Sequence, residues 1–181
     1  MGLIERSVEV RAEPARVWDV LVDVRCLPKV SSHTVEVKNA PDRLTHRGER
    51  FTQVVVAVGK RFESEWEVHG FDPGRAISIE GSVGFGVRYC LTETVAPAGA
   101  GRSTLSVRIQ YKLPFGPLGR IASRLGVERL AAVEAQQVLT RIAAFAEERT
   151  PEPPEHRSRR RPRLRGRRAA PPASASGNPT S

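Results

Sequence analysis

Several polar and aromatic side chains lie in strand-like stretches at positions that share the parity of the apolar residues. Because alternate residues of a strand point to opposite faces, we expect these side chains to face the interior. An aromatic ring with a polar tip suits a flat ligand, and an inward polar group can hold the ligand's polar end. The candidate ligand-binding residues are Arg6, Gln53, Ser64, Trp66, Tyr89 and Tyr111, with Glu134 at the edge of a later helical stripe.

Arg6 is the costliest of these candidates, because a buried guanidinium without a partner is strongly unfavourable. Two explanations are open: the side chain reaches the rim of the sheet, or it meets Glu134 or an anionic oxygen of a ligand. Trp66 and Tyr89 also have two interpretations, as ordinary core residues or as walls of a binding site. A shift of one residue in the register of a strand would turn all its candidates outward.

The sequence carries no recognisable catalytic or metal-binding motif. The glycine-rich segments 81–86 and 99–104 lack the residue order of nucleotide-binding loops, so we predict turns there. Paired-ligand spacing is absent among the histidines and cysteines, which are His33, His46, His69, His156, Cys26 and Cys90. We therefore expect no metal and no cofactor, and we assign no catalytic residue.

Seven stretches have the alternating pattern of half-buried strands: Leu3–Arg11, Thr34–Lys38, Glu49–Val58, Arg61–His69, Ala76–Glu80, Val87–Val95 and Thr104–Tyr111. Short turns join the last six, so consecutive strands must pair antiparallel in a meander. Two short helices, near 14–22 and 26–30, separate the first strand from that meander, and Pro14 favours the start of the first helix. The predicted fold class is α+β.

A long helix is predicted over Pro117–Glu148. Its apolar face consists of Val127, Ala131, Ala135, Val138, Ile142 and Phe145. The middle of that face is small and its last turns are bulky. Either the helix leaves room beneath its centre, or a facing Trp or Phe fills the gap. The first alternative adds Ala131, Ala135 and Val138 to the candidate ligand-binding residues.

The chain of 181 residues has a formal net charge of +9, but the charge is concentrated at one end. Residues 149–181 carry nine arginines and two glutamates, a net charge of +7, which leaves about +2 on the remainder. We predict a folded domain over 1–149 and a disordered Arg/Pro-rich tail over 150–181. The tail is either a solvated extension without a partner, or a weak non-specific contact for nucleic acid or an anionic surface.

The opening of the chain resembles that of the START-like (SRPBCC, helix-grip) superfamily, particularly its polyketide cyclase/dehydrase-like branch. The residues that carry the resemblance are Ser7–Leu21, Asp23, Pro28, Thr104 and the stretch from Leu139 to Glu147. The resemblance implies a seven-stranded antiparallel sheet wrapped around the long C-terminal helix, with an apolar cavity between them. Cyclases of this branch use inward Arg, Tyr and Ser side chains, but no such role is carried over to individual residues here.

We therefore expect a domain that binds one small apolar or aromatic molecule, lipid-like or polyketide-like, in an internal cavity. One alternative is an aromatase/cyclase or dehydratase that acts on a polyketide-like chain. A second alternative is an adaptor whose basic tail docks to anionic partners. The absence of an export signal, a membrane span or a lipid anchor predicts a cytoplasmic location, as a monomer or a homodimer.

Overall fold

The computed structural model describes residues 2–57, 59–83, 86–112 and 127–148. The strands in this part of the chain are β1 (Gly2–Val10), β2 (Thr34–Lys38), β3 (Arg50–Ala57), β4 (Lys60–Asp72), β5 (Ala76–Val83), β6 (Val87–Pro97) and β7 (Ser103–Lys112). The helices are α1 (Pro14–Leu21), the short 3₁₀ helix η1 (Val24–Cys26), α2 (Leu27–Val30) and α4 (Val127–Glu148). Residues 117–126, where the long helix was predicted to begin, and the tail lie outside the described residues.

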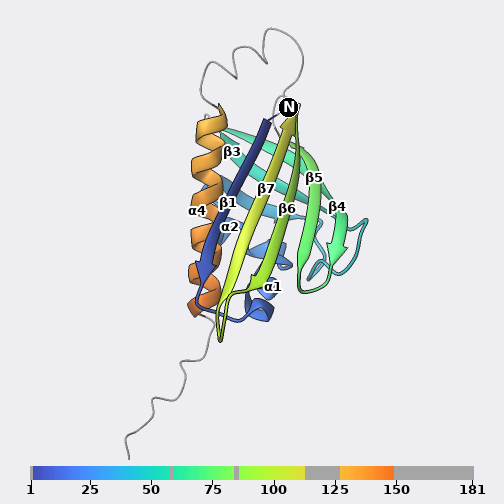
Figure 1. Cartoon of the computed structure of the whole chain (residues 1–181). Helices are drawn as coiled ribbons and strands as arrows, with labels where there is room; N and C mark the ends of the chain where they lie inside the picture. The colour runs from blue at the N-terminus through green and yellow to red at the C-terminus, as the bar shows by residue number, and fades with distance from the viewer. Residues whose placement is uncertain (1, 58, 84–85, 113–126, 149–181) are drawn as a thin grey trace, which may run out of the picture. The chain divides into compact units, whose positions relative to one another are not determined.

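All seven strands form one antiparallel sheet in the order β1-β7-β6-β5-β4-β3-β2. The predicted meander of six strands is confirmed, because β2 to β7 pair in sequence order. The first strand pairs with the last, which places β1 at one edge and β6 and β5 near the middle (Figure 1). The central strands are therefore the ones most completely surrounded by other strands.

The strand boundaries lie within a few residues of those predicted, and the largest extension is at β4, which continues to Asp72. A β-bulge between Val68 and Gly70 shifts the parity of β4, so that Phe71 pairs with Ile77 and faces inward. Its ring meets Trp18 of α1 edge-on, with the ring centroids 5.5 Å apart. The bulge thus keeps the last part of β4 in contact with the helices.

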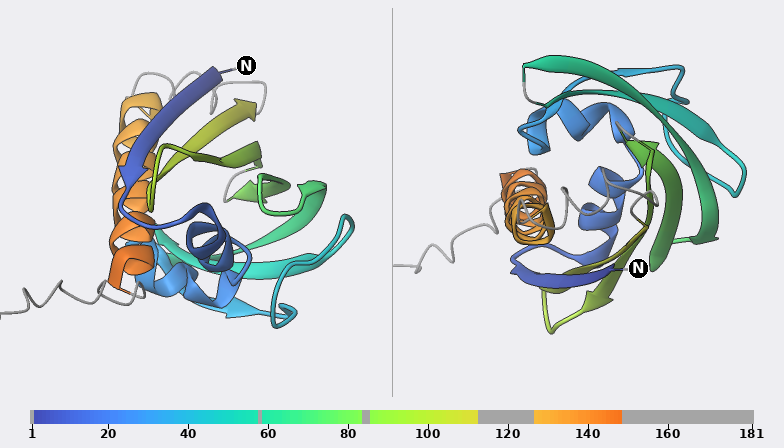
Figure 2. Two further views of the ribbon diagram at one scale, coloured as in Figure 1. Left: turned by 60° about the horizontal axis from the view of Figure 1, so that its bottom comes forward. Right: turned by 90° about the horizontal axis from the view of Figure 1, so that it is seen from above.

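The helices lie on the inner side of the curved sheet (Figure 2). Pro14 occupies the first turn of α1, as predicted, with Glu13 as the N-cap residue. α4 packs against β1 and α1 through Leu139, Ile142 and Ala146, all of which are buried. A second apolar cluster lies under β3, β4 and β5, around Phe51 and Trp66. The interior is therefore covered on the helix side and lined by two separate groups of core residues.

Candidate functional site

Three of the predicted site residues lie in one row across the inner face of the sheet. Strand pairing aligns Tyr111 of β7 with Tyr89 of β6, Tyr89 with Gly81 of β5, and Gly81 with Trp66 of β4. The row is completed by Gly2 on β1 beside Tyr111 and by Phe51 on β3 beside Trp66. We call these six residues the aromatic row. The four rings come from four different strands, and the register of the sheet aligns them.

Gly81 provides the space that the Trp66 ring occupies. A Cβ atom at position 81 would lie 2.6 Å from the Glu65 carbonyl oxygen and 2.6 Å from Cδ2 and Cε3 of Trp66. Contacts this short are not tolerated without movement, and the backbone oxygen is the less mobile partner. Gly81 is therefore part of the site, because it sets the position of a wall residue.

The Gly81→Ala variant is expected to displace Trp66 and to lower the free energy of unfolding by ~1–3 kcal/mol through overpacking. Urea unfolding measures the stability. Tryptophan emission in a Trp18→Phe background, which leaves Trp66 as the one tryptophan of the chain, reports the displacement. Gly70→Ala is the matched control, because its Cβ would meet Ser78 at an ordinary 3.4 Å. Equal behaviour of the two variants would contradict the close packing of Trp66 on Gly81.

Tyr89 and Tyr111 form a tilted pair with ring centroids 6.3 Å apart. Tyr89 is half-buried, whereas Tyr111 and Trp66 are almost completely buried, with 9% and 6% of their surface exposed. Burial, and secondarily the neighbouring Tyr111, raises the pKa of the Tyr89 phenol above its usual range. Tyr89 is therefore a neutral phenol at physiological pH and can donate a hydrogen bond from within the site.

Glu93 is the inward residue that the sequence analysis did not select. It lies on β6 between Leu91 and Val95 on the same face, and it pairs with Ile77 of β5 and Val107 of β7, both of which are buried. Its carboxyl group makes no hydrogen bond or ion pair with any described residue. Burial alone raises the pKa of this carboxyl from 4.5 to about 7. The signal was available, because Glu93 has the same parity as the selected Tyr89.

Three consecutive inward side chains of β6 are less buried than inward side chains of the neighbouring strand β7. On β7, Leu105 and Val107 are 0% and 5% exposed. On the more central β6, the consecutive inward residues Tyr89, Leu91 and Glu93 are each only half-buried. The same is true of the interior-facing residues Ile79, Trp18, Leu27 and Val138. Accessible surface is thus retained along the inner face of β6 and on the interior-facing residues close to it.

Gln53 and Ser64 are cross-strand neighbours on β3 and β4. The Gln53 side-chain amide donates to the Thr34 hydroxyl oxygen over 2.6 Å. Ser64 is 1% exposed, and among the described residues neither its hydroxyl nor the Trp66 indole N–H has a hydrogen-bond partner. A buried donor without a partner costs free energy on folding. The Ser64 hydroxyl and the Trp66 indole N–H are therefore unusual among buried polar groups.

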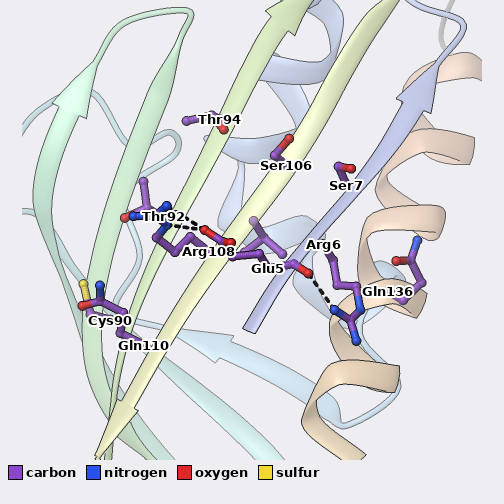
Figure 3. Close-up of a pocket in the computed structure, with 11 residues that line it drawn as sticks. Glu5, Arg6, Ser7, Cys90, Thr92, Thr94, Ser106, Arg108, Gln110 and Gln136 are labelled. Carbon is purple, nitrogen blue, oxygen red and sulfur yellow. Dashed lines mark hydrogen bonds and ion pairs between the residues drawn. The ribbon is translucent and has the colours of Figure 1, made fainter. Parts of the chain in front are cut away.

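Arg6 occupies the inner face by pairing, opposite Val107, but β1 is an edge strand and the side chain is exposed. Its guanidinium donates to the Glu5 carbonyl oxygen over 2.7 Å, on the side of β1 near Gln136 of α4 (Figure 3). The structure thus matches the explanation in which Arg6 reaches the rim. The alternative contact with Glu134 is not formed.

Glu134 instead ties α4 to the segment that precedes β2. Its carboxylate accepts hydrogen bonds from the hydroxyls of Ser31 and Ser32, the closest at 3.1 Å, and lies 3.5 Å from His33 Nε2. On the neighbouring turns of α4, Ala135 is buried whereas Ala131 and Val138 are half-buried. The three small or apolar candidates therefore face the interior, while Glu134 holds the helix in place.

A groove of about 870 Å³ lies mainly on the opposite, outward face of the sheet, over β1, β7 and β6 (Figure 3). Its lining is polar, with Ser7, Thr92 and Ser106 among its residues. The charged residues Arg108 and Glu5 satisfy each other, with Arg108 Nη2 lying 2.6 Å from Glu5 Oε1. This groove contains none of the interior candidates except Arg6.

No cluster of three or more potential metal ligands occurs in the described part of the chain. Within the same ranges, no helix is both long and apolar enough to cross a membrane.

Residues 1–147 match the protein family described as polyketide cyclase/dehydrase and lipid transport. The uncharacterized protein Rv1546 of Mycobacterium tuberculosis is 32% identical over 127 residues, which are 68% of this chain and 87% of that protein. The crystal structure of the ZhuI aromatase/cyclase from Streptomyces sp. R1128 is similar at a TM-score of 0.71 and 18% identity, covering 82% of this chain and 94% of that one.

A START superfamily protein from Mycobacterium smegmatis is similar at a TM-score of 0.57 and 17% identity, covering 79% of this chain and 98% of that one. Identity this low shows the fold alone. Together with the sheet order and the helix on its inner side, these two structures confirm the predicted START-like, helix-grip fold.

Proposed function

Because the chain belongs to the polyketide cyclase/dehydrase and lipid transport family, we propose that it binds one small apolar or aromatic molecule between its sheet and its helices. The observation that carries the proposal is the incomplete burial of Tyr89, Leu91 and Glu93 on a central strand, on the face of the sheet where the helices lie. In a densely filled core these would be the most buried side chains. Space beside them accounts for the surface that they retain.

The chemistry of the lining varies along this interior. The aromatic row lies at one end, and its rings suit a flat or ring-containing part of a ligand. The next row toward α1 is aliphatic, with Ile109, Leu91 and Ile79 aligned across β7, β6 and β5. Glu93 follows at the end nearest α1. A largely apolar ligand with one polar group matches this order.

The test is binding of N-phenylnaphthylamine, a neutral dye that fluoresces in apolar surroundings. The full chain is expected to bind it saturably at one site. Leu91→Trp fills the interior from β6 and should weaken binding by at least about tenfold, equivalent to ~1.4 kcal/mol. Thr94→Trp is the matched control, because Thr94 is exposed and has the opposite parity on the same strand.

A filled core gives the opposite pattern. Leu91→Trp would then overpack the interior and lower the stability by ~1–3 kcal/mol, and neither the wild type nor Thr94→Trp would bind the dye. That combination would overturn the proposal.

A second candidate function is the aromatase/cyclase or dehydratase reaction on a polyketide-like chain. It is favoured by a carboxyl group whose pKa is raised to about 7 inside an apolar site, because such a group can both donate and accept a proton near neutral pH. Loss of water from a poly-β-ketone substrate, followed by mass spectrometry, distinguishes this reaction from binding alone. A role of the tail in docking to anionic partners falls outside the described residues and stays a prediction.

A further inference from the structure

Glu93 lies on the inner face in a second cross-strand row, separate from the aromatic row. Strand pairing places Arg6 beside Val107, Val107 beside Glu93, Glu93 beside Ile77 and Ile77 beside Phe71. Val107 belongs to the core cluster around α4, and Ile77 belongs to the cluster around Trp66. The carboxyl group therefore lies at the boundary between the two core clusters. It is enclosed by protein, but the Glu93 side chain is only half-buried.

The core cluster on the α1 and α4 side of Glu93 consists of apolar side chains and Tyr111. β6 contributes Leu91 and Val95, and α1 contributes Val17 and Leu21 to the same core cluster. The inward residues of α4 in this cluster, Ala135, Leu139 and Ile142, are uncharged. No basic side chain in the described part of these elements reaches the Glu93 carboxyl.

The charged residues Arg6, Arg16 and Asp19 make contacts away from Glu93 or lie at the surface. Arg6 is separated from Glu93 by Val107, and its exposed guanidinium bonds to the Glu5 carbonyl oxygen. On α1, Arg16 is exposed, and Asp19 pairs at the surface with Arg43. The ionisable inward groups of the aromatic row are the phenols of Tyr89 and Tyr111, which are weak acids. The described interior thus contains acidic side chains and no basic side chain that pairs with Glu93.

We infer that the interior site takes an apolar or aromatic molecule that carries a basic amine, and that the Glu93 carboxylate binds this amine as an ammonium ion. This inference rests on the proposed function. It also assigns a selectivity, because a ligand with a carboxylate or phosphate group would meet only acidic side chains and would be excluded.

The physical reason is mutual compensation. A carboxylate or an ammonium ion alone in an apolar interior is strongly destabilised, and each supplies the counter-charge that the other lacks. A hydrogen bond between charged groups is also stronger than one between neutral groups. A neutral ligand would leave the carboxyl protonated, and an anionic ligand would add a second unfavourable charge.

The position of Glu93 also restricts the length of the ligand. Tyr89 and Glu93 are four residues apart on β6, which corresponds to about 13 Å along a strand. The amine therefore lies at the α1 end of the interior, while an aromatic part would lie near the aromatic row. A linker of a few methylene groups between ring and amine spans the aliphatic row between them.

Binding is coupled to a proton. When the carboxyl is protonated, docking of an ammonium ion transfers the carboxyl proton to solvent and leaves an ion pair. Since the pKa of Glu93 is about 7 in the free protein, binding at neutral pH should release roughly half a proton per ligand. Replacing Glu93 by glutamine removes this release.

The experiment uses three probes with the same ring and chain: naphthylbutylamine, naphthylbutanol and naphthylbutanoic acid. Each competes with N-phenylnaphthylamine on the full chain, and calorimetry in buffers of different ionisation enthalpy counts the released protons. The amine is expected to bind at least about tenfold more tightly than the alcohol, the expected gain for a charged hydrogen bond, and the acid most weakly. In Glu93→Gln the advantage of the amine should disappear, whereas Glu65→Gln, on the exposed outer face, should keep it.

Two failures are distinguishable. If the dye itself does not bind, the proposed function fails. If the dye binds but the wild type does not prefer the amine, or binds it without releasing protons, the assignment of Glu93 fails while the binding site stands. The wild-type comparison decides the matter even if Glu93→Gln does not fold.

Discussion

The Ile142→Asp variant is expected to be unfolded or nearly so at room temperature. Ile142 is 3% exposed on the face of α4 that packs against β1 and α1. An aspartate there would place an unpaired charge in the core and remove the isoleucine packing, and changes of this kind cost more than ~4 kcal/mol. Far-UV circular dichroism and thermal unfolding measure the effect.

Ala144→Asp is the control, since Ala144 lies two residues further along the same helix and is exposed. It introduces the same side chain at similar cost to helix propensity, so it should change stability by less than ~1 kcal/mol. If Ile142→Asp unfolded at the same temperature as Ala144→Asp, the packing of α4 on the sheet described here would be wrong.

The ligand-free protein is expected to lose stability as the pH rises from about 4.5 to about 7, through Glu93. Burial raises the pKa of this carboxyl in the folded protein from 4.5 to about 7. Within that window the folded state holds a proton that the unfolded state has released, so the free energy of unfolding falls with increasing pH. Below the window Glu93 is protonated in both states and contributes nothing.

Above pH 7 the full penalty should be present, and a pKa difference of this size corresponds to ~3 kcal/mol. Glu93→Gln removes the ionisation. The variant should therefore be more stable than the wild type at about pH 8 and should approach it at about pH 5, where the carboxyl is neutral. Urea unfolding at a series of pH values gives both curves, and their difference isolates Glu93 from other titrating groups.

Glu65→Gln provides the comparison, because Glu65 is exposed on the outer face and its curve should follow the wild type. A constant difference between the wild type and Glu93→Gln across the whole pH range would show that the carboxyl is solvated. It would also remove the support for an amine partner.

The alternation of apolar and polar residues predicted the strands well because a half-buried strand needs that pattern locally. Short turns then determined the antiparallel neighbours, so the order β2 to β7 followed without knowledge of long-range contacts. Parity also predicted correctly that Trp66, Tyr89 and Tyr111 face inward. The same rule applied four residues further along β6 would have selected Glu93.

Parity was insufficient for Arg6. The residue has inward parity, but its exposure depends on β1 being an edge strand beside α4, where a long side chain can reach solvent. Likewise, the pairing of Glu134 with Ser31 and Ser32 joins residues more than 100 positions apart. No local pattern specifies such contacts, because they arise only when the helix has been placed on the sheet.

By itself, the sequence determined the strand pattern, the short helices and the resemblance to a fold family, because each depends on neighbouring residues. It predicted Ala135 and Ile142 correctly as buried positions of α4, but not Leu139, Ala143 and Ala146, because the rotation of a helix about its axis depends on the surface that it packs against. The tertiary structure decided which side chains meet. Cross-strand pairing aligned Tyr111, Tyr89, Gly81 and Trp66 in one row, and it placed Glu93 between Val107 and Ile77, where no described residue supplies a charged partner. Register and enclosure are properties of several strands together, and the chemistry of the interior depends on both.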